Sequence, residues 1–142
     1  MFRAVIVAMA IMSLGPQAKK PEIRTFKQVG CGCCELWARH MRAAGYTVTV
    51  TEAPDLPVVK RQHGVPAQME SCHTSLVGGY VVEGHVPADV IDKLLAEKPR
   101  VKGIAVPGMP MGSPGMEQGG RKDPYNVVTF DTNGKSSVFA TR

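Results

Sequence analysis

Hydrophobic and polar residues along this 142-residue chain follow two patterns, which predict a regular order of strands and helices. Apolar residues that alternate with polar ones indicate strands, and apolar residues three or four positions apart indicate helices. We expect strands at 22–29, 46–51, 74–77 and 80–83, and helices at 34–44, 55–62 and from Pro87 to just before Pro99.

Turn and capping residues support these boundaries. Gly45 closes the first expected helix, and Asp55 is a suitable N-cap for the second. Gly78 and Gly79 favour a tight hairpin between the third and fourth strands. The resulting order, β-α-β-α-β-β-α, predicts an α/β fold with a thioredoxin-like domain.

The composition changes after this pattern ends. Residues 101–120 are too rich in glycine and proline for us to expect a helix or strand there. Residues 125–130 and 135–140 then flank Asp131-Thr132-Asn133-Gly134, a strong signal for a β-hairpin. We therefore expect a loop at 101–120 and a hairpin at 125–140, outside the thioredoxin-like core.

The N-terminus has the features of an export signal. Arg3 precedes an uncharged apolar run from Ala4 to Leu14, and Gly15-Pro16 then breaks the run. This run is far shorter than the roughly 18 residues that a membrane-spanning helix needs. We expect residues 1–18 to be a cleaved signal peptide and 19–142 to be one exported, periplasmic domain without a stable membrane span. An uncleaved anchor is the alternative.

Charge does not point to a nucleic-acid partner. The formal net charge is +5, but lysine and arginine are scattered and do not interleave with aromatic residues. A solvated surface explains this balance better than a binding site for nucleic acid.

The densest chemistry lies at the expected start of the first helix, in Cys31-Gly32-Cys33-Cys34. Cys31 and Cys34 form a C-x-x-C pair, which suits disulfide exchange or metal binding. Thiol–disulfide chemistry does not need the third sulfur, whereas several thiolates suit a soft metal. A helix N-terminus also favours the thiolate form. A structural disulfide with spare thiols is the alternative.

Two more candidate ligands come from the segments around the third and fourth strands. Cys72 precedes the third strand, and in a thioredoxin-like fold this places it opposite the turn that carries the other cysteines. The flanking Ser71 and His73 make Cys72 a better ligand than a core residue, although free cysteines are often buried as small hydrophobic residues. His85 follows the fourth strand and is a weaker candidate by itself.

The glycine- and proline-rich loop carries thioether sulfurs. Met109, Met111 and Met116 lie on it, and thioethers are soft ligands that favour Cu(I). Flexible packing against the domain is the competing explanation.

Four segments together resemble the CopG-like copper-resistance proteins, a family long described as a bacterial domain of unknown function. They are Val29 to Cys34, Met69 to Thr74, Gly79 to Pro87, and Val106 to Glu117. The resemblance covers nearly the whole chain from about Ile23. It implies a periplasmic copper-binding protein of copper resistance whose copper is redox-active, in places as a multi-copper thiolate cluster.

The resemblance also implies roles for individual residues. Cys31, Cys33, Cys34 and Cys72 would be thiolate ligands, joined by His85 and a loop methionine. We expect copper ions, and other periplasmic copper-handling proteins, as partners. A thiol–disulfide oxidoreductase that uses Cys31 and Cys34 is the main alternative, and a zinc or iron–sulfur protein is a weaker one.

Overall fold

The computed structural model describes residue 15 and residues 18–142. They form three α-helices, a short 3-10 helix and seven strands. The helices are α1 (Gly32–Ala43), α2 (Leu56–Gln62), η1 (Ala67–Met69) and α3 (Ala88–Glu97). The strands are β1 (Ile23–Lys27), β2 (Val48–Glu52), β3 (His73–Val77), β4 (Tyr80–Glu83), β5 (Gly103–Ala105), β6 (Asn126–Phe130) and β7 (Ser136–Thr141).

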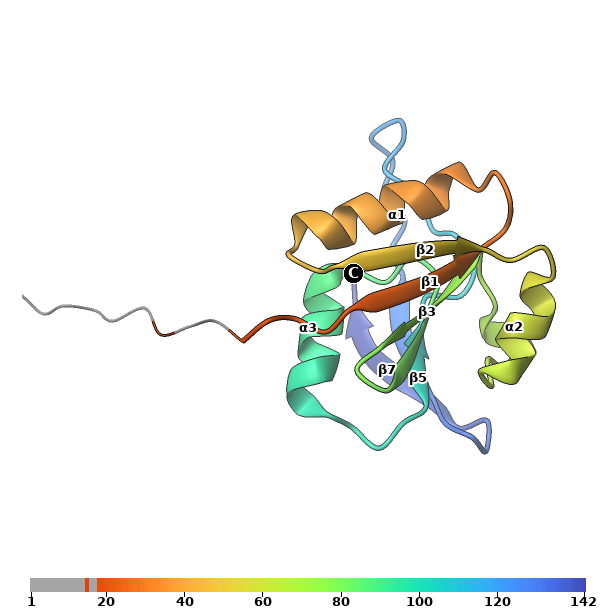
Figure 1. Ribbon diagram of the computed structural model, residues 1–142, viewed down its shortest axis with the longest axis vertical. Coiled ribbons are helices and arrows are strands. Elements are labelled where there is room, and N and C mark those ends of the chain that lie inside the picture. Colours follow the sequence, from red (N-terminus) through yellow and green to blue (C-terminus); the bar gives the residue numbers. More distant parts are fainter. Residues whose placement is uncertain (1–14, 16–17) are drawn as a thin grey trace, which may run out of the picture.

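All seven strands belong to one mixed sheet in the order β2-β1-β3-β4-β5-β6-β7. β1 pairs with β2 in parallel and with β3 antiparallel, and β3 and β4 form an antiparallel hairpin. This part of the sheet, with α1 after β1 and α3 after β4, confirms the predicted thioredoxin-like fold (Figure 1).

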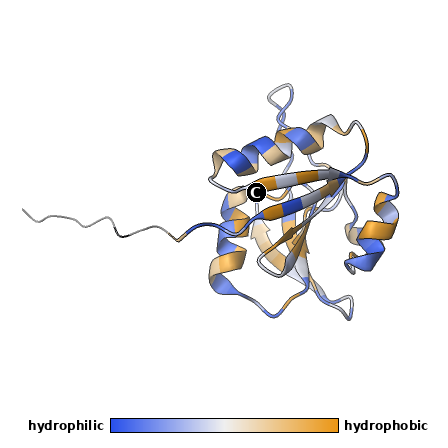
Figure 2. Cartoon of the chain, in the orientation of Figure 1, coloured by the Kyte–Doolittle hydropathy of each residue, from blue (hydrophilic) through white to orange (hydrophobic). Residues whose placement is uncertain are grey.

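Each face of the sheet packs against its own hydrophobic core. The larger core joins α1 and α3 to the sheet through residues such as Trp37, Ile91 and Ile104, all fully buried. The smaller core includes Met69 and Phe130 on the opposite face. Successive strand residues point to opposite faces, so the adjacent Val81 and Val82 of β4 belong to different cores. Figure 2 shows the apolar residues that the strands carry.

The elements that carry the cysteines begin where local chemistry allows. Gly30 has φ +74°, which makes the turn from β1 into α1, and Cys31 is the N-cap of that helix. Asp55 caps α2 as expected, because its side chain accepts a hydrogen bond from the backbone N–H of Val58.

Three expectations about the fold need correction. The segment 101–120 is not wholly a loop, because Gly103–Ala105 forms β5 between β4 and β6. A Cβ at Gly103 would lie 2.1 Å from the carbonyl oxygen of Val81, so glycine allows this close pairing. The C-terminal hairpin, β6–β7, is therefore a continuation of the central sheet. In addition, α1 begins at Gly32, two residues earlier than expected.

The expected signal peptide at 1–18 lies outside the described residues except for Gly15 and Ala18. Within the described part of the chain, no helix has the length and apolar character needed to cross a membrane.

Candidate metal centre

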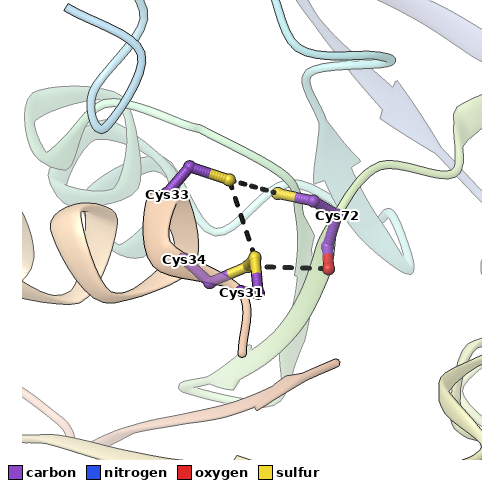
Figure 3. Close-up of side chains that lie close together, drawn as sticks. All are labelled: Cys31, Cys33, Cys34 and Cys72. Carbon is purple, nitrogen blue, oxygen red and sulfur yellow. Dashed lines mark hydrogen bonds between the residues drawn. A yellow bond between two sulfur atoms is a disulfide. The ribbon is translucent and has the colours of Figure 1, made fainter. Parts of the chain in front are cut away.

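The start of α1 and the start of β3 meet, and this contact brings all four cysteines together (Figure 3). The Sγ atoms of Cys31 and Cys33 are 3.6 Å apart, and those of Cys33 and Cys72 are 3.8 Å apart. The four sulfur atoms all lie within 4.8 Å of one another. A zinc–thiolate bond is about 2.3 Å long, so sulfurs that share one metal ion lie up to about 4.6 Å apart. The short distance between Cys33 and Cys72 confirms the predicted position of Cys72 opposite the helix turn.

Two of these sulfurs are bonded to each other. Cys31 and Cys34 form a disulfide, while Cys33 and Cys72 are free and half-buried. Cys34 is fully buried, and its Sγ lies 3.7 Å from the carbonyl oxygen of Cys72. Cys31 and Cys34 can thus act as thiolate ligands only after this disulfide has been reduced.

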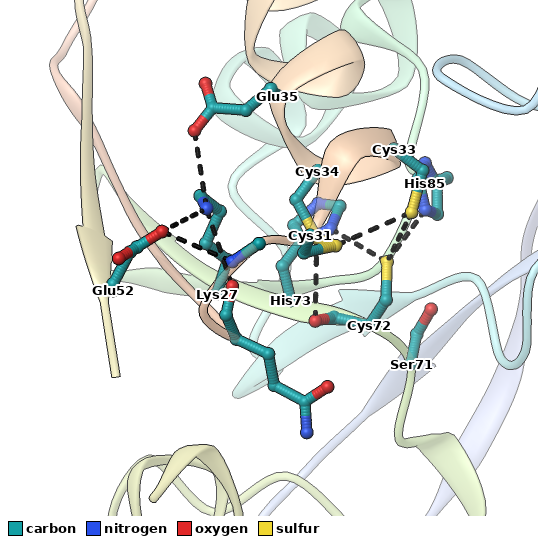
Figure 4. Close-up of a disulfide and its surroundings, with 12 residues drawn as sticks. Lys27, Cys31, Cys33, Cys34, Glu35, Glu52, Ser71, Cys72, His73 and His85 are labelled. Carbon is teal, nitrogen blue, oxygen red and sulfur yellow. Dashed lines mark hydrogen bonds and ion pairs between the residues drawn. A yellow bond between two sulfur atoms is a disulfide. The ribbon is translucent and has the colours of Figure 1, made fainter. Parts of the chain in front are cut away.

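His85 lies close to Cys72 and Cys33 and is fully buried rather than exposed in a loop (Figure 4). Its Nε2 is 2.8 Å from the Sγ of Cys72, and its Nδ1 is 2.6 Å from the carbonyl oxygen of Pro114. The carbonyl can only accept, so Nδ1 carries the proton and the lone pair of Nε2 faces the sulfur. A backbone carbonyl that fixes the histidine tautomer in this way is typical of metal-binding histidines.

Sequence reasoning did not select His73 as a candidate ligand. Its ring is fully buried against Trp37, at 4.5 Å between ring centroids, and its Nδ1 lies 3.2 Å from the Sγ of Cys72. Cys72, His73 and His85 form a second group of possible ligand atoms within 4.8 Å of one another. The Nε2 of His73 is buried without a hydrogen-bond partner. The one sequence feature that could have identified His73 as a ligand is its position directly after Cys72.

Burial sets the protonation of this group. Desolvation holds the pKa of His73 well below its usual value and lowers that of His85, so both imidazoles are neutral at pH 7. Burial, with the neighbouring Cys33, raises the pKa of Cys72 to about 12. The expectation that the helix N-terminus keeps the thiols ionised therefore does not extend to Cys72, which lies outside α1. A metal ion would have to displace its proton.

The segment after β5 covers the site. A Cβ at Gly115, where φ is +91°, would lie 2.7 Å from the carbonyl oxygen of Cys33 and 3.1 Å from the Nδ1 of His85. This glycine therefore permits the close contact between the loop and the start of α1. Among the loop methionines, Met109 is about half exposed, and Met111 and Met116 are partly buried.

One family model covers part of this site. The family model described as "Protein of unknown function, DUF411" matches residues 69–116, which include Cys72, both buried histidines and the covering loop. A comparison with curated protein sequences gave no match.

Two solved structures, described as copper resistance protein CopG form 1 and form 2, are similar to this chain over most of its length. Each is 46% identical, with a TM-score of 0.82, and the alignment covers 87% of this chain and 98% of the other. This chain belongs to the CopG family of copper resistance proteins.

Proposed function

We propose that this protein is exported to the periplasm and binds Cu(I) there as part of copper resistance. The observation that carries the proposal is the group of four sulfur atoms within 4.8 Å, at the junction of α1 and β3. Cu(I) prefers soft thiolate and thioether ligands, and a thiolate can bridge two ions. The names of the similar structures, which are copper resistance proteins, support copper over zinc or iron.

Loading the full set of sulfurs requires reduction of the disulfide. A dithiol reductant would supply two electrons and two protons, which convert the disulfide into two thiols while the reductant becomes a disulfide. Cys31, Cys33, Cys34 and Cys72 then release their protons as they bind Cu(I). Proton release also couples copper affinity to pH.

The two buried histidines add nitrogen atoms to the ligand set, next to Cys72. The Nε2 of His85 and the Nδ1 of His73 both face that sulfur, at 2.8 and 3.2 Å. We propose His85, and with it His73, as nitrogen ligands. The donor set of sulfur and neutral imidazole would also suit a copper ion that changes between Cu(I) and Cu(II).

The copper content of a Cys33→Ser variant tests this function. Protein is reduced and loaded anaerobically with Cu(I), and the metal-to-protein ratio is measured by elemental analysis. We expect a lower ratio than in the wild type, because Cys33 lies between Cys31 and Cys72. Leu36→Ser on the same helix is the control and should not change the ratio. An unchanged ratio in Cys33→Ser would contradict a site that uses all four sulfurs.

A thiol–disulfide oxidoreductase is the second candidate, favoured by the Cys31–Cys34 disulfide at the start of α1. In that case Cys31 would attack a partner disulfide and Cys34 would resolve the mixed disulfide. The same variant separates the two functions. Cys33→Ser should retain disulfide exchange if the pair acts alone, and it should lose copper if the cluster operates.

We also propose that residues 1–18 are removed on export and that residues 19–142 work as one periplasmic domain. The apolar run behind Arg3 supports this.

A further inference from the structure

A buried ion pair lies next to Ser71 and Cys72, the residues just before β3. The Lys60 ammonium on α2 contacts the Glu83 carboxylate at the end of β4, and both side chains are at most 5% exposed. Lys60 also donates to the hydroxyl of Thr74 at 3.1 Å, and that hydroxyl donates to the second carboxylate oxygen of Glu83 at 2.6 Å. Every charged group of this network therefore has a partner within the protein.

The network ends on the backbone next to Cys72. The Oε1 of Glu83 accepts a hydrogen bond from the backbone N–H of Ser71 at 2.9 Å. The hydroxyl of Ser71 in turn donates to the carbonyl oxygen of Gly108, on the loop that covers the site. Ser71 lies beside Cys72 in Figure 4. The Glu83 carboxylate is thus linked through Ser71 both to the backbone next to Cys72 and to the covering loop.

Stability alone does not account for this pair. A buried ion pair loses the hydration of both charges, and replacement by apolar residues is often neutral or stabilising. The bend at Gly84 is also specific, because a Cβ there would lie 2.6 Å from the Oγ of Ser71 and 2.7 Å from the carbonyl oxygen of Val106. The chain keeps both a costly charge pair and a tight glycine contact around the same residue, Ser71.

We propose that Glu83, held by Lys60, is a positioning residue for the metal site. Its carboxylate fixes the Ser71 N–H, which sets the position of the Cys72 sulfur relative to Cys33 and His85. Lys60 fixes the carboxylate rather than contacting the metal. This inference rests on the proposed function for its metal-binding readout, but it also predicts a property of the metal-free protein.

Two double variants isolate the hydrogen bond to Ser71. Lys60→Met/Glu83→Gln removes both charges but keeps an oxygen that can accept from the Ser71 N–H. Lys60→Met/Glu83→Leu removes the charges and the acceptor. A comparison of the two variants therefore tests the acceptor at matched charge. If the leucine variant does not fold, Lys60→Met/Glu83→Met replaces it, since methionine is flexible and its thioether is only a weak acceptor.

Two measurements apply to these variants and to the wild type. The first is the rate at which a competing chelator removes Cu(I) from reduced, loaded protein. The second is the rate of Cys72 alkylation in metal-free protein that also carries Cys33→Ser, where the intact disulfide leaves Cys72 as the one free thiol. Unfolding midpoints in urea are recorded for every variant.

We expect the glutamine variant to stay within about twofold of the wild type in both rates. The leucine variant should lose Cu(I) about tenfold faster, the effect of one lost hydrogen bond behind a metal ligand. Its Cys72 should also be alkylated several-fold faster, whatever its unfolding midpoint. Equal rates in the two double variants would overturn the positioning role. If wild-type protein holds no Cu(I), the proposed function fails, and the alkylation rates alone decide this inference.

Discussion

Gly115→Ala is the substitution for which the structure gives the sharpest prediction. The added Cβ would lie 2.7 Å from the carbonyl oxygen of Cys33 and 3.0 Å from the backbone nitrogen of Trp37. Both are backbone atoms of α1, so neither can rotate away. Gly119 provides a matched control, because its φ is also positive, at +68°, and a Cβ there would meet nothing within 4 Å.

The difference between the two alanine variants measures the contact itself. Both variants have a left-handed backbone penalty of about 1–2 kcal/mol, and only the part that φ +91° and φ +68° have in common cancels in the comparison. Overpacking against fixed atoms costs a further ~1–3 kcal/mol, and only Gly115→Ala has it. We therefore expect Gly115→Ala to be less stable than Gly119→Ala by about 2 kcal/mol, or roughly 8 °C in Tm for a domain of this size.

Urea denaturation of both metal-free variants, with the disulfide intact, measures this difference. The midpoint should fall in Gly115→Ala while the slope stays the same. The same displacement would separate Pro114 from His85 and break the hydrogen bond that fixes the imidazole, so Cu(I) affinity should fall by about tenfold. Equal unfolding midpoints for the two variants would refute the argument that the loop packs on α1 through this glycine.

Three further predictions concern pH, the loop methionines and export. The pKa of His73 is lowered by burial, so its contribution to stability is complete above about pH 6.5 and is lost as the pH falls, by up to about 1.4 kcal/mol per pH unit. Urea unfolding of metal-free His73→Asn at pH 7.5 and 5.5 should therefore show a smaller loss than the wild type, and an equal loss would contradict the buried neutral imidazole. Replacing Met109, Met111 and Met116 by leucine should leave folding intact but speed Cu(I) transfer to a chelator, whereas unchanged transfer would assign the loop a packing role only. Mass spectrometry of protein isolated from the periplasm should find residues 1–18 absent, and their presence would replace the signal peptide with an anchor.

The local pattern of the sequence was enough to predict the thioredoxin-like order. Alternation in β1 and β2, Gly78-Gly79 between β3 and β4, and the Asp55 cap each act within a few residues, so a single sequence contains the whole signal. β5 could not be predicted in the same way. Gly103 has poor strand propensity, and it forms a strand because its backbone can approach Val81 across the sheet.

The sequence also placed Cys72 near Cys33, since the predicted fold brings the start of β3 to the start of α1. It could not supply the environment of the histidines. His85 looked like an exposed loop residue, and its burial depends on Pro114, 29 positions further along the chain. His73 is confined by the ring of Trp37, and the Glu83 carboxylate meets the Ser71 N–H only after β4 has folded against β3. The order and spacing of residues in the sequence were therefore enough to predict which sulfurs could meet. The protonation and orientation of His73, His85 and Glu83 depend on burial and on long-range contacts, which arise only in the folded protein.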